Sequence, residues 1–463
     1  MLFNSHDYLV YFLPIAVLGY FAFSARPRWA VRWLVVASLV FYGWWNPRYV
    51  PLIVVSMVFN YAVALCIQRA THPRGWMIVG VTGNLALLGL FKYSDFLLRT
   101  LAALGLMPLV QLHLALPLGI SFFTFTQIAF LVDVARRKVR ETAFDNYALF
   151  VTFFPHLLAG PIIHHAEMMP QFASVANKRV AWDNVARGLF LLAVGLAKKT
   201  LLADPLAPLA ASGFDHAATV GTLDAWVAVL AYTLQIYFDF SGYTDMALGA
   251  ALLFNIRLPI NFDSPYRSLD LREFWHRWHI TLSRFLREYL YIPLGGNRAA
   301  EPRVLANLLV TFVLGGLWHG AAWTFVLWGA LHGAGLCCVR GWKRTGHVLP
   351  PMVAGMLTLL FVALAWVFFR AASVPDALAI VRAMLGFAHA PSASPTTAAL
   401  FQGAVPPVVP LVAAAVIALL PRNSNTLSRD LSTSWIAGAC TTAALVVSIL
   451  QFGHVAPFLY FNF

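Results

Sequence analysis

Runs of apolar residues recur along the whole of this chain, and many are close to the length of about 20 residues that an α-helix needs to cross a bilayer. Only 11% of the 463 residues are Asp, Glu, Lys or Arg, whereas about a quarter of a typical soluble domain is charged. So few charges cannot cover the surface of a soluble globule of this size. The sequence therefore predicts an all-α protein that crosses a membrane many times, and it disfavours a soluble multi-domain protein.

The apolar runs predict about 11 to 13 membrane crossings. The expected spans are residues 8–23, 31–45, 50–67, 77–91, 114–132, 147–163, 188–202, 226–253, 304–317, 321–339, 352–369, 405–420 and 435–452. Two shorter apolar pieces, 96–109 and 377–387, are expected to be partial or re-entrant. Because the chain shows no internal repeat and only a short polar loop at 388–397, we expect one membrane domain over residues 1–463.

The net charge of +13 comes from basic residues that lie in short clusters between the apolar runs. That arrangement follows the positive-inside rule, so no nucleic-acid partner is needed to explain the charge. With these clusters inside, both ends of the chain lie outside, and the first ten residues begin a membrane span rather than a cleaved signal peptide. The clusters are Arg26, Arg28 and Arg32; Arg69 and Arg74; Arg136, Arg137, Lys138 and Arg140; Arg340, Lys343 and Arg344; and Arg422 and Arg429.

The segment 268–294 is too charged to cross a membrane, but its apolar residues keep helical spacing. It is therefore predicted to be an amphipathic helix that lies in an interface or against a bundle. On such a helix His279 falls roughly 70° from the centre of the apolar stripe and His276 roughly 130°. We expect His279 rather than His276 to be buried, where a structural hydrogen bond is the simplest role for a lone histidine.

Polar residues also occur inside apolar runs, where they usually face a cavity or a partner. The stretch QIYFDFSGYTD places Gln235, Asp239 and Asp245 in an apolar helix. The two carboxylates either orient a neighbour or bind a cation, or these polar groups serve helix kinking and interhelical hydrogen bonding. In GGLWHG, His319 follows Trp318 and is flanked by glycines that permit close approach of a ligand or backbone.

Other reactive constellations are weak. His164 and His165 are adjacent in PHLLAGPIIHH and are expected to form a loop pair at a membrane interface. No Ser-His-Asp or Cys-His arrangement is legible. The four cysteines form no Cys-x-x-Cys pair, and the His-x-x-His spacing at 276–279 lacks the glutamate of His-Glu-x-x-His. We therefore expect no metal site.

The stretches QIYFDFSGYTDMALG at 235–249, LPINFDSPYRSLDLREFWHRWHITLSRFLREYLYIPLGGNR at 258–298 and GGLWHGAAWTFVLWGALHG at 315–333 closely resemble the membrane-bound O-acyltransferase (MBOAT) superfamily, in its alginate O-acetyltransferase (AlgI) branch. PHLLAGPI at 155–162 and the ending PFLYFNF resemble it too. The resemblance implies a ring of tilted helices around a central tunnel, with the motif core at 235–333. It implies that His319 and His279 are catalytic. The further candidates to line the tunnel or touch substrate are Asp239, Asp245, Gln235, Trp318, Trp275, His276 and Ser283.

The implied reaction is transfer of an acetyl group from a cytoplasmic thioester, expected to be acetyl-CoA, without a bound cofactor. A neutral imidazole can take the proton of an attacking hydroxyl, or His319 can carry the acetyl group briefly. His279 would donate to the oxyanion or position the acceptor. The resemblance further implies a Gram-negative inner membrane with periplasmic termini. It also implies an extracytoplasmic partner, an SGNH transferase like AlgJ or AlgX, that passes the acetyl group to an exopolysaccharide such as alginate.

Three alternatives stay open at this point. A D-alanyl or other acyl transferase for a different cell-wall polymer would carry similar motifs. A transporter or lipid flippase would use the intramembrane polar residues to bind cargo, although such proteins often show matched repeats that this sequence lacks. A metal-dependent intramembrane enzyme would need more ligands than the sequence offers.

Overall fold

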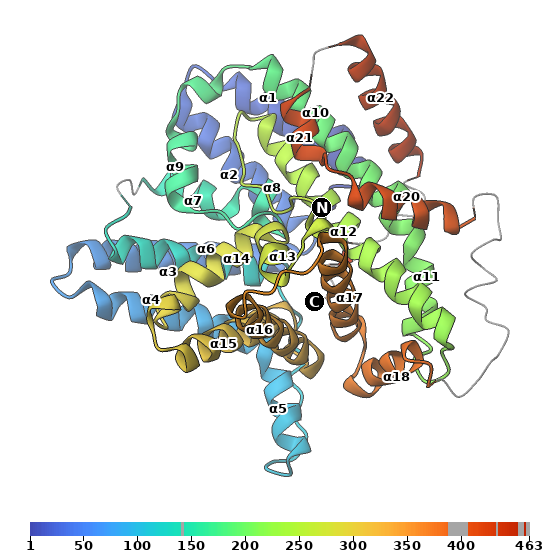
Figure 1. Ribbon diagram of the computed structural model, residues 1–463. Coiled ribbons are helices and arrows are strands. Elements are labelled where there is room, and N and C mark those ends of the chain that lie inside the picture. Colours follow the sequence, from blue (N-terminus) through green and yellow to red (C-terminus); the bar gives the residue numbers. More distant parts are fainter. Residues whose placement is uncertain (140–142, 388–405, 432–433, 452–457, 460–463) are drawn as a thin grey trace. The chain divides into compact units, whose positions relative to one another are not determined.

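The computed structural model describes residues 1–139, 143–387, 406–431, 434–451 and 458–459 (Figure 1). These residues form helices joined by short connections, and none of them lies in a β-strand, although one isolated antiparallel bridge joins Phe262 and Trp278. The all-α prediction is confirmed. The expected polar loop at 388–397, Arg140, the start of the expected span 405–420 and most of the C-terminal PFLYFNF lie outside the described residues.

The chain forms two compact units. The first comprises Met1–Val194, Tyr243–Pro259 and Ser428–Pro457, and the second comprises Gly195–Gly242, Ile260–Leu427 and Phe458–Phe463. The long helix α12 (Thr222–Leu252, 31 residues) contributes residues 222–242 to the second unit and 243–252 to the first. The single membrane domain expected from the sequence stays a prediction.

The first unit is built around α3 and α4, which a reciprocal pair of buried amides joins. Asn60 Nδ2 donates to Asn84 Oδ1 at 3.2 Å, and Asn84 Nδ2 donates to Asn60 Oδ1 at 2.6 Å. In chain order this unit contains η1 (Asp7–Phe12), α1 (Leu13–Ala22), α2 (Pro27–Gly43), η2 (Pro47–Tyr49), α3 (Val50–Arg69), α4 (Pro73–Leu88), η3 (Gly89–Tyr93), α5 (Ser94–Ala103), α6 (Ile120–Ala135), α7 (Phe144–Thr152), α8 (Phe154–Leu157), α9 (His165–Ala173), η4 (Ala176–Lys178), most of α10 (Trp182–Ala197) and α22 (Trp435–Leu450).

The second unit carries the motifs at 260–333 that the sequence singled out. Its hydrophobic core joins α11, α12, α13, α16, α17, α18 and α20. Besides the first part of α12 it contains η5 (Lys198–Ala203), α11 (Asp204–Phe214), η6 (Pro265–Arg267), α13 (Leu271–Arg277), α14 (Ile280–Leu286), η7 (Arg287–Tyr291), η8 (Gly296–Arg298), α15 (Glu301–His319), α16 (Trp323–Arg344), α17 (Pro351–Arg370), α18 (Val374–Met384), α20 (Val408–Leu419) and most of α21 (Ser424–Arg429).

Three of the described helical runs are long and apolar enough to cross a membrane: Pro47–Arg69, Pro73–Ala103 and Pro351–Arg370. Four shorter apolar helices accompany them, at Asp7–Ala22, Ile120–Ala135, Val408–Leu419 and Trp435–Leu450. Exposed Leu, Val, Ile and Trp side chains are spread over these helices, as expected where lipid is the solvent. The structure is therefore that of a membrane protein, while the 11 to 13 crossings stay a prediction.

The expected span at 147–163 is wrong. The structure ends α7 at Thr152, inserts the four-residue α8, and continues without regular structure to α9. Pro155 explains the break, because its ring removes an amide N–H and clashes with the preceding turn of a helix. His164 precedes α9 and His165 begins it, and both are buried in the first unit. The pair therefore lies where a loop joins a helix, and its place at a membrane interface stays a prediction.

Helices α15 and α16 lie side by side in the second unit and are in close contact (Figure 1). A Cβ atom placed on Gly316 would lie 2.2 Å from the carbonyl oxygen of Phe325, and one on Gly329 would lie 2.2 Å from the carbonyl oxygen of Phe312. The two glycines let the helix backbones meet. This contact matters for the site, because α15 ends at His319.

We therefore expect Gly329→Ala to destabilise the protein by about 1–3 kcal/mol, since backbone atoms must separate to admit the methyl group. Gly341→Ala is the matched control on the same helix, because a Cβ there meets nothing within 4 Å. That control should be neutral or stabilising by about 0.5–1 kcal/mol. Thermal unfolding of the purified variants in detergent measures both. Equal melting temperatures would show that the helices do not depend on this contact.

Candidate active site

The predicted amphipathic helix at 268–294 is interrupted at its centre. Helix α13 ends at Arg277, Trp278 is extended (φ −103°, ψ 128°), and His279 adopts the left-handed conformation (φ 43°, ψ 53°) before α14 begins. The expectation of one continuous helix is wrong. A left-handed conformation costs a residue with a Cβ about 1–2 kcal/mol, so other contacts must hold His279 there.

Those contacts come from the extended segment 261–263, which pairs with 277–280 through the backbone. The Asp263 N–H donates to the Arg277 carbonyl at 3.0 Å, and the Ile280 N–H donates to the Asn261 carbonyl at 3.0 Å. The bridge between Phe262 and Trp278 lies between these two bonds. The pairing supplies partners to backbone groups that a continuous helix would have satisfied internally.

The break buries His279 completely, at 0% exposure, and leaves His276 exposed. The choice of His279 as the buried histidine is confirmed, although the turn at Trp278 produces the burial and not the face of one helix. His276 instead makes a local contact between its Nδ1 and the Arg272 carbonyl at 2.6 Å. The structure therefore does not bring His276 into the buried site. Ser283 lies one turn after His279, and its N–H donates to the His279 carbonyl at 3.0 Å.

His319 is the last residue of α15, and Gly320 continues in an extended conformation. The imidazole retains 5% exposure and lies among aromatic rings. Its centroid is 4.9 Å from that of Trp318, 5.2 Å from that of Trp328 and 5.2 Å from that of Phe369. Apolar walls of this kind strengthen any hydrogen bond or charge interaction that the imidazole makes.

The two candidate histidines meet in this setting. The ring centroids of His279 and His319 are 6.2 Å apart, and Trp318 lies 6.2 Å from His279 by the same measure. On the other side of His279 the ring of Phe240, from α12, packs edge to face at 4.8 Å. The structure therefore brings His279 together with Phe240 and with the adjacent residues Trp318 and His319, from three separate stretches of sequence.

Trp275 does not contact the two candidate histidines directly but packs against residues of α16. Its Nε1–H donates to Nδ1 of His332 on α16 at 3.2 Å. Trp328 connects Trp275 to the histidine pair, because its ring centroid lies 5.8 Å from that of Trp275 and 5.2 Å from that of His319. Sequence analysis missed His332, a fully buried residue, although its position within an apolar helix was a usable signal.

The polar residues of α12 lie in different surroundings and do not form one cluster. Asp239 is buried and pairs with Lys199 Nζ at 2.6 Å, and its second oxygen accepts the Leu459 N–H at 2.9 Å. Asp204 also pairs with Lys199, at 2.8 Å. The cation that Asp239 binds is thus a protein side chain, as a buried carboxylate requires. Lys199 was missed because a basic pair after an apolar run usually indicates topology.

Gln235 and Asp245 are buried on the same helix. Gln235 belongs to the second unit with Asp239, and Asp245 belongs to the first unit. Among the described residues no group of three or more His, Cys, Asp or Glu side chains is placed to hold a metal ion.

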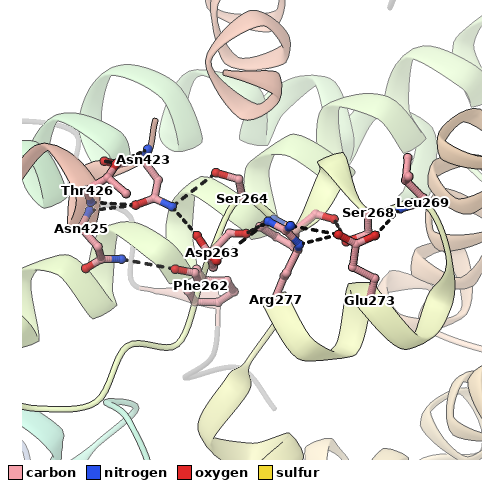
Figure 2. Close-up of polar contacts among 11 residues, drawn as sticks. Phe262, Asp263, Ser264, Ser268, Leu269, Glu273, Arg277, Asn423, Asn425 and Thr426 are labelled. Carbon is pink, nitrogen blue, oxygen red and sulfur yellow. Dashed lines mark hydrogen bonds and ion pairs between the residues drawn. The ribbon is translucent and has the colours of Figure 1, made fainter. Parts of the chain in front are cut away.

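A polar network holds the extended segment beside α13 (Figure 2). The Asn423 amide donates to Asp263 Oδ1 at 2.8 Å and to the Ser264 hydroxyl at 3.4 Å. Arg277 donates to the Asp263 carbonyl at 3.1 Å and to Glu273 at 2.9 Å. The turn that carries His279 is thereby tied to residues more than 140 positions later in the chain.

Comparison with known proteins adds one family match and three similar relatives. The sequence model of the membrane-bound O-acyltransferase (MBOAT) family matches residues 28–373. The chain is 42% identical to the peptidoglycan O-acetyltransferase of Helicobacter pylori, over all of this chain and 98% of that protein. It is 41% identical to the probable alginate O-acetylase AlgI of Pseudomonas aeruginosa, over 84% of this chain and 75% of that protein. A teichoic acid D-alanyltransferase of Streptococcus thermophilus is 28% identical over 49% of this chain and 57% of its own length.

The start of α13 is fixed by Asp270, whose side chain accepts the N–H of Glu273 at 2.8 Å as an N-cap. Its other oxygen pairs with Lys343 Nζ at 2.7 Å. Burial alone would raise the pKa of Asp270, but the hydrogen bond to Lys343, the Glu273 N–H and the charge of Lys343 hold the pKa below its usual value. The folded state therefore favours the ionised carboxylate.

We expect Asp270→Ala to lower stability by about 0.5–2 kcal/mol at neutral pH, as loss of an N-cap does. Because the folded pKa is depressed, the contribution is present above the unfolded pKa of about 4 and is lost as the pH falls below it. Melting temperatures measured between pH 7 and pH 3 check this. The gap between wild type and variant should close in acid, and a gap that is independent of pH would contradict the assignment.

Proposed function

The chain belongs to the membrane-bound O-acyltransferase family and is an acyltransferase, and on that premise we propose that it moves acetyl groups from acetyl-CoA in the cytoplasm across the inner membrane for O-acetylation of a cell-surface polysaccharide. The observation that carries the proposal is the buried pairing of His279 and His319, 6.2 Å apart and walled by Trp318, Trp328 and Phe369. Membership in an enzyme family decides against the transporter interpretation.

The chemistry is attack of a hydroxyl on the thioester carbonyl. A C–O bond forms, the C–S bond breaks, the hydroxyl proton passes to an imidazole, and the imidazolium returns it to the departing thiolate. A neutral imidazole suits both proton steps, because its ordinary pKa lies near 6.5. At a separation of 6.2 Å between ring centroids, one acyl carbonyl or hydroxyl placed between the rings can contact both.

A second route satisfies the same geometry. His319 attacks the thioester itself, the thiolate leaves, and the acetyl-imidazole then passes its acetyl group to the hydroxyl. The aromatic walls serve both routes, since they keep out the water that would hydrolyse the thioester or the acyl-enzyme. The two routes differ in whether label from acetyl-CoA remains on the protein when no acceptor is present.

The basic cluster at 340–344 contributes less to donor binding than its sequence suggests. Arg340 and Arg344 both pair with Glu301, at 2.7 and 2.5 Å, and Lys343 pairs with Asp270 at 2.7 Å. The proposed topology places these basic segments in the cytoplasm and both termini in the periplasm, on the positive-inside rule. We do not assign the phosphates of the donor to the cluster.

The proposal includes a periplasmic partner, an SGNH transferase of the AlgJ or AlgX type, that delivers the acetyl group to the polymer. Two acceptors are favoured by specific relatives. Alginate follows from the AlgI proteins, and peptidoglycan follows from the H. pylori protein, with which alignment spans both chains almost completely. D-alanyl transfer has weaker support, since that relative matches about half of this chain.

The test uses cells in which the chain is the sole source of this activity. Ester-linked acetate is released by mild base from purified exopolysaccharide and, separately, from purified peptidoglycan, and is quantified. If deletion of the gene removes acetate from one polymer, that polymer is the acceptor. If neither polymer loses acetate, the proposed function is contradicted. Proteoliposomes given labelled acetyl-CoA on one face at a time test the donor and its side of entry.

His319→Ala should abolish polymer acetylation, with a loss of at least 10²- to 10⁴-fold in transfer, because it removes the proton-transfer group. The variant should insert and melt like the wild type. His347→Ala is the control, since His347 is exposed after the end of α16 and should be silent. Normal acetylation by well-expressed His319→Ala would refute the catalytic assignment.

His279→Ala should impair transfer far more than His276→Ala. The first removes a ring that faces His319, whereas the second removes an exposed ring bonded locally to Arg272. Rates per folded protein, normalised by fluorescence-detected gel filtration, make the comparison. Equal effects of the two substitutions would remove His279 from the site.

A further inference from the structure

The side-chain oxygen of Asn261 contacts three polar atoms, one of which is Nδ1 of His279. Asn261 is fully buried, at 0% exposure. Its Oδ1 lies 3.2 Å from the backbone nitrogen of Thr281, 2.6 Å from the Thr281 hydroxyl and 3.3 Å from Nδ1 of His279. Asn261 is not among the candidate site residues that the sequence predicted.

The orientation of this amide follows from the chemistry of its partners. A backbone N–H can only donate, so the atom of Asn261 that faces the Thr281 nitrogen must be the oxygen and not the NH₂ group. The same oxygen faces Nδ1 of His279. Because an oxygen of an amide can only accept, the hydrogen between them must lie on Nδ1. The Thr281 N–H thus fixes the orientation of the Asn261 amide, and that orientation fixes the tautomer of His279.

We propose that Asn261 is a positioning residue that holds His279 as the Nδ1–H tautomer, which puts the lone pair of the ring on Nε2. The proposal rests on the function proposed above, in which His279 takes part in acyl transfer. It gives His279 a direction: Nε2 of the neutral ring accepts a hydrogen bond from the hydroxyl of the acceptor and cannot donate one to an oxyanion. Of the two roles that the sequence left open for His279, oxyanion donor or positioner of the acceptor, this tautomer is compatible with the second.

The backbone keeps Asn261 in place for this task. Its carbonyl accepts the Ile280 N–H at 3.0 Å, so Asn261 is bonded to the ring of His279 and to both residues that follow it. The neighbouring Asp263 is held by Asn423 and Arg277 (Figure 2). An imidazole whose other nitrogen is hydrogen-bonded has its rotation about χ2 restricted as well as its tautomer. Asn261 therefore sets both the tautomer and the orientation of the His279 ring.

The tautomer is measured directly by ¹⁵N NMR of protein labelled at histidine, with His279→Gln used to identify the resonances of His279. We expect Nδ1 to show the shift of a protonated nitrogen and Nε2 that of an unprotonated one near neutral pH. The opposite pattern overturns the proposal. Since no catalysis is involved, this result stands whether or not the proposed acetyl transfer is correct.

The functional arm compares Asn261→Ala, Asn261→Asp and Asn60→Ala. Asn60 is the matched control: it is also a fully buried asparagine with hydrogen bonds to a partner amide and to the backbone, those of Asn84 and Ser56. Asn261→Ala should lower kcat about 10- to 100-fold, because the ring loses its orientation, with little change in KM for acetyl-CoA. Asn60→Ala should lower only the yield of folded protein.

Asn261→Asp should restore most of the rate, since a carboxylate accepts the same hydrogen bonds. It should also shift the acidic limb of the pH–rate profile to higher pH, because a negative charge stabilises the imidazolium. Among the contacts described above, His319 is the titratable group that faces His279, while Phe240, Trp318 and Thr281 are neutral. An unshifted profile in Asn261→Asp, or an Asn261→Ala variant whose rate per folded molecule equals that of Asn60→Ala, overturns the positioning role.

Discussion

The pairing of residues 261–263 with 277–280 is the interaction on which the site depends. In a helical membrane protein each N–H and C=O is normally satisfied within its own helix, because lipid offers no replacement. Interrupting a helix at Trp278 and His279 therefore requires partners from elsewhere in the protein. The extended segment supplies them with two backbone hydrogen bonds, of 3.0 Å each. His279 can adopt its left-handed conformation because those bonds offset the cost, and the break turns its ring toward His319.

Several polar groups in the apolar interior of the second unit are paired with one another. Asp239 and Asp204 share Lys199, and Trp275 donates to His332. A charge or N–H left alone in such surroundings would cost several kcal/mol. The low dielectric that makes isolation costly also makes each remaining interaction stronger. A reactive imidazole in this environment is therefore sensitive to one hydrogen bond, which is why a neutral amide at Asn261 is sufficient to direct it.

The sequence predicted what depends on local pattern. Apolar runs locate α3, α17 and α22 closely, and 235–333 contains both histidines of the site, although Phe369 lies outside it. It failed where structure depends on distant partners. The helix break at Trp278 could not be foreseen, because the residues that stabilise it lie some 15 positions earlier and at Asn423. His279 was chosen by helical geometry that does not exist there. Asn261, Lys199 and His332 were missed because their importance lies in what they contact, and an isolated sequence does not show those contacts.

The two histidines are placed for different work. His319 ends the 19-residue helix α15, where the aligned peptide dipoles favour positive charge. An imidazolium or an acetyl-imidazolium at His319 would therefore be stabilised as it forms. His279 instead lies at the N-cap of the short helix α14, and its Nδ1 is held by a neutral amide oxygen, which favours an uncharged ring that accepts a hydrogen bond. In the proposed reaction, charge that develops during transfer is thus better accommodated at His319, while His279 orients the group that attacks.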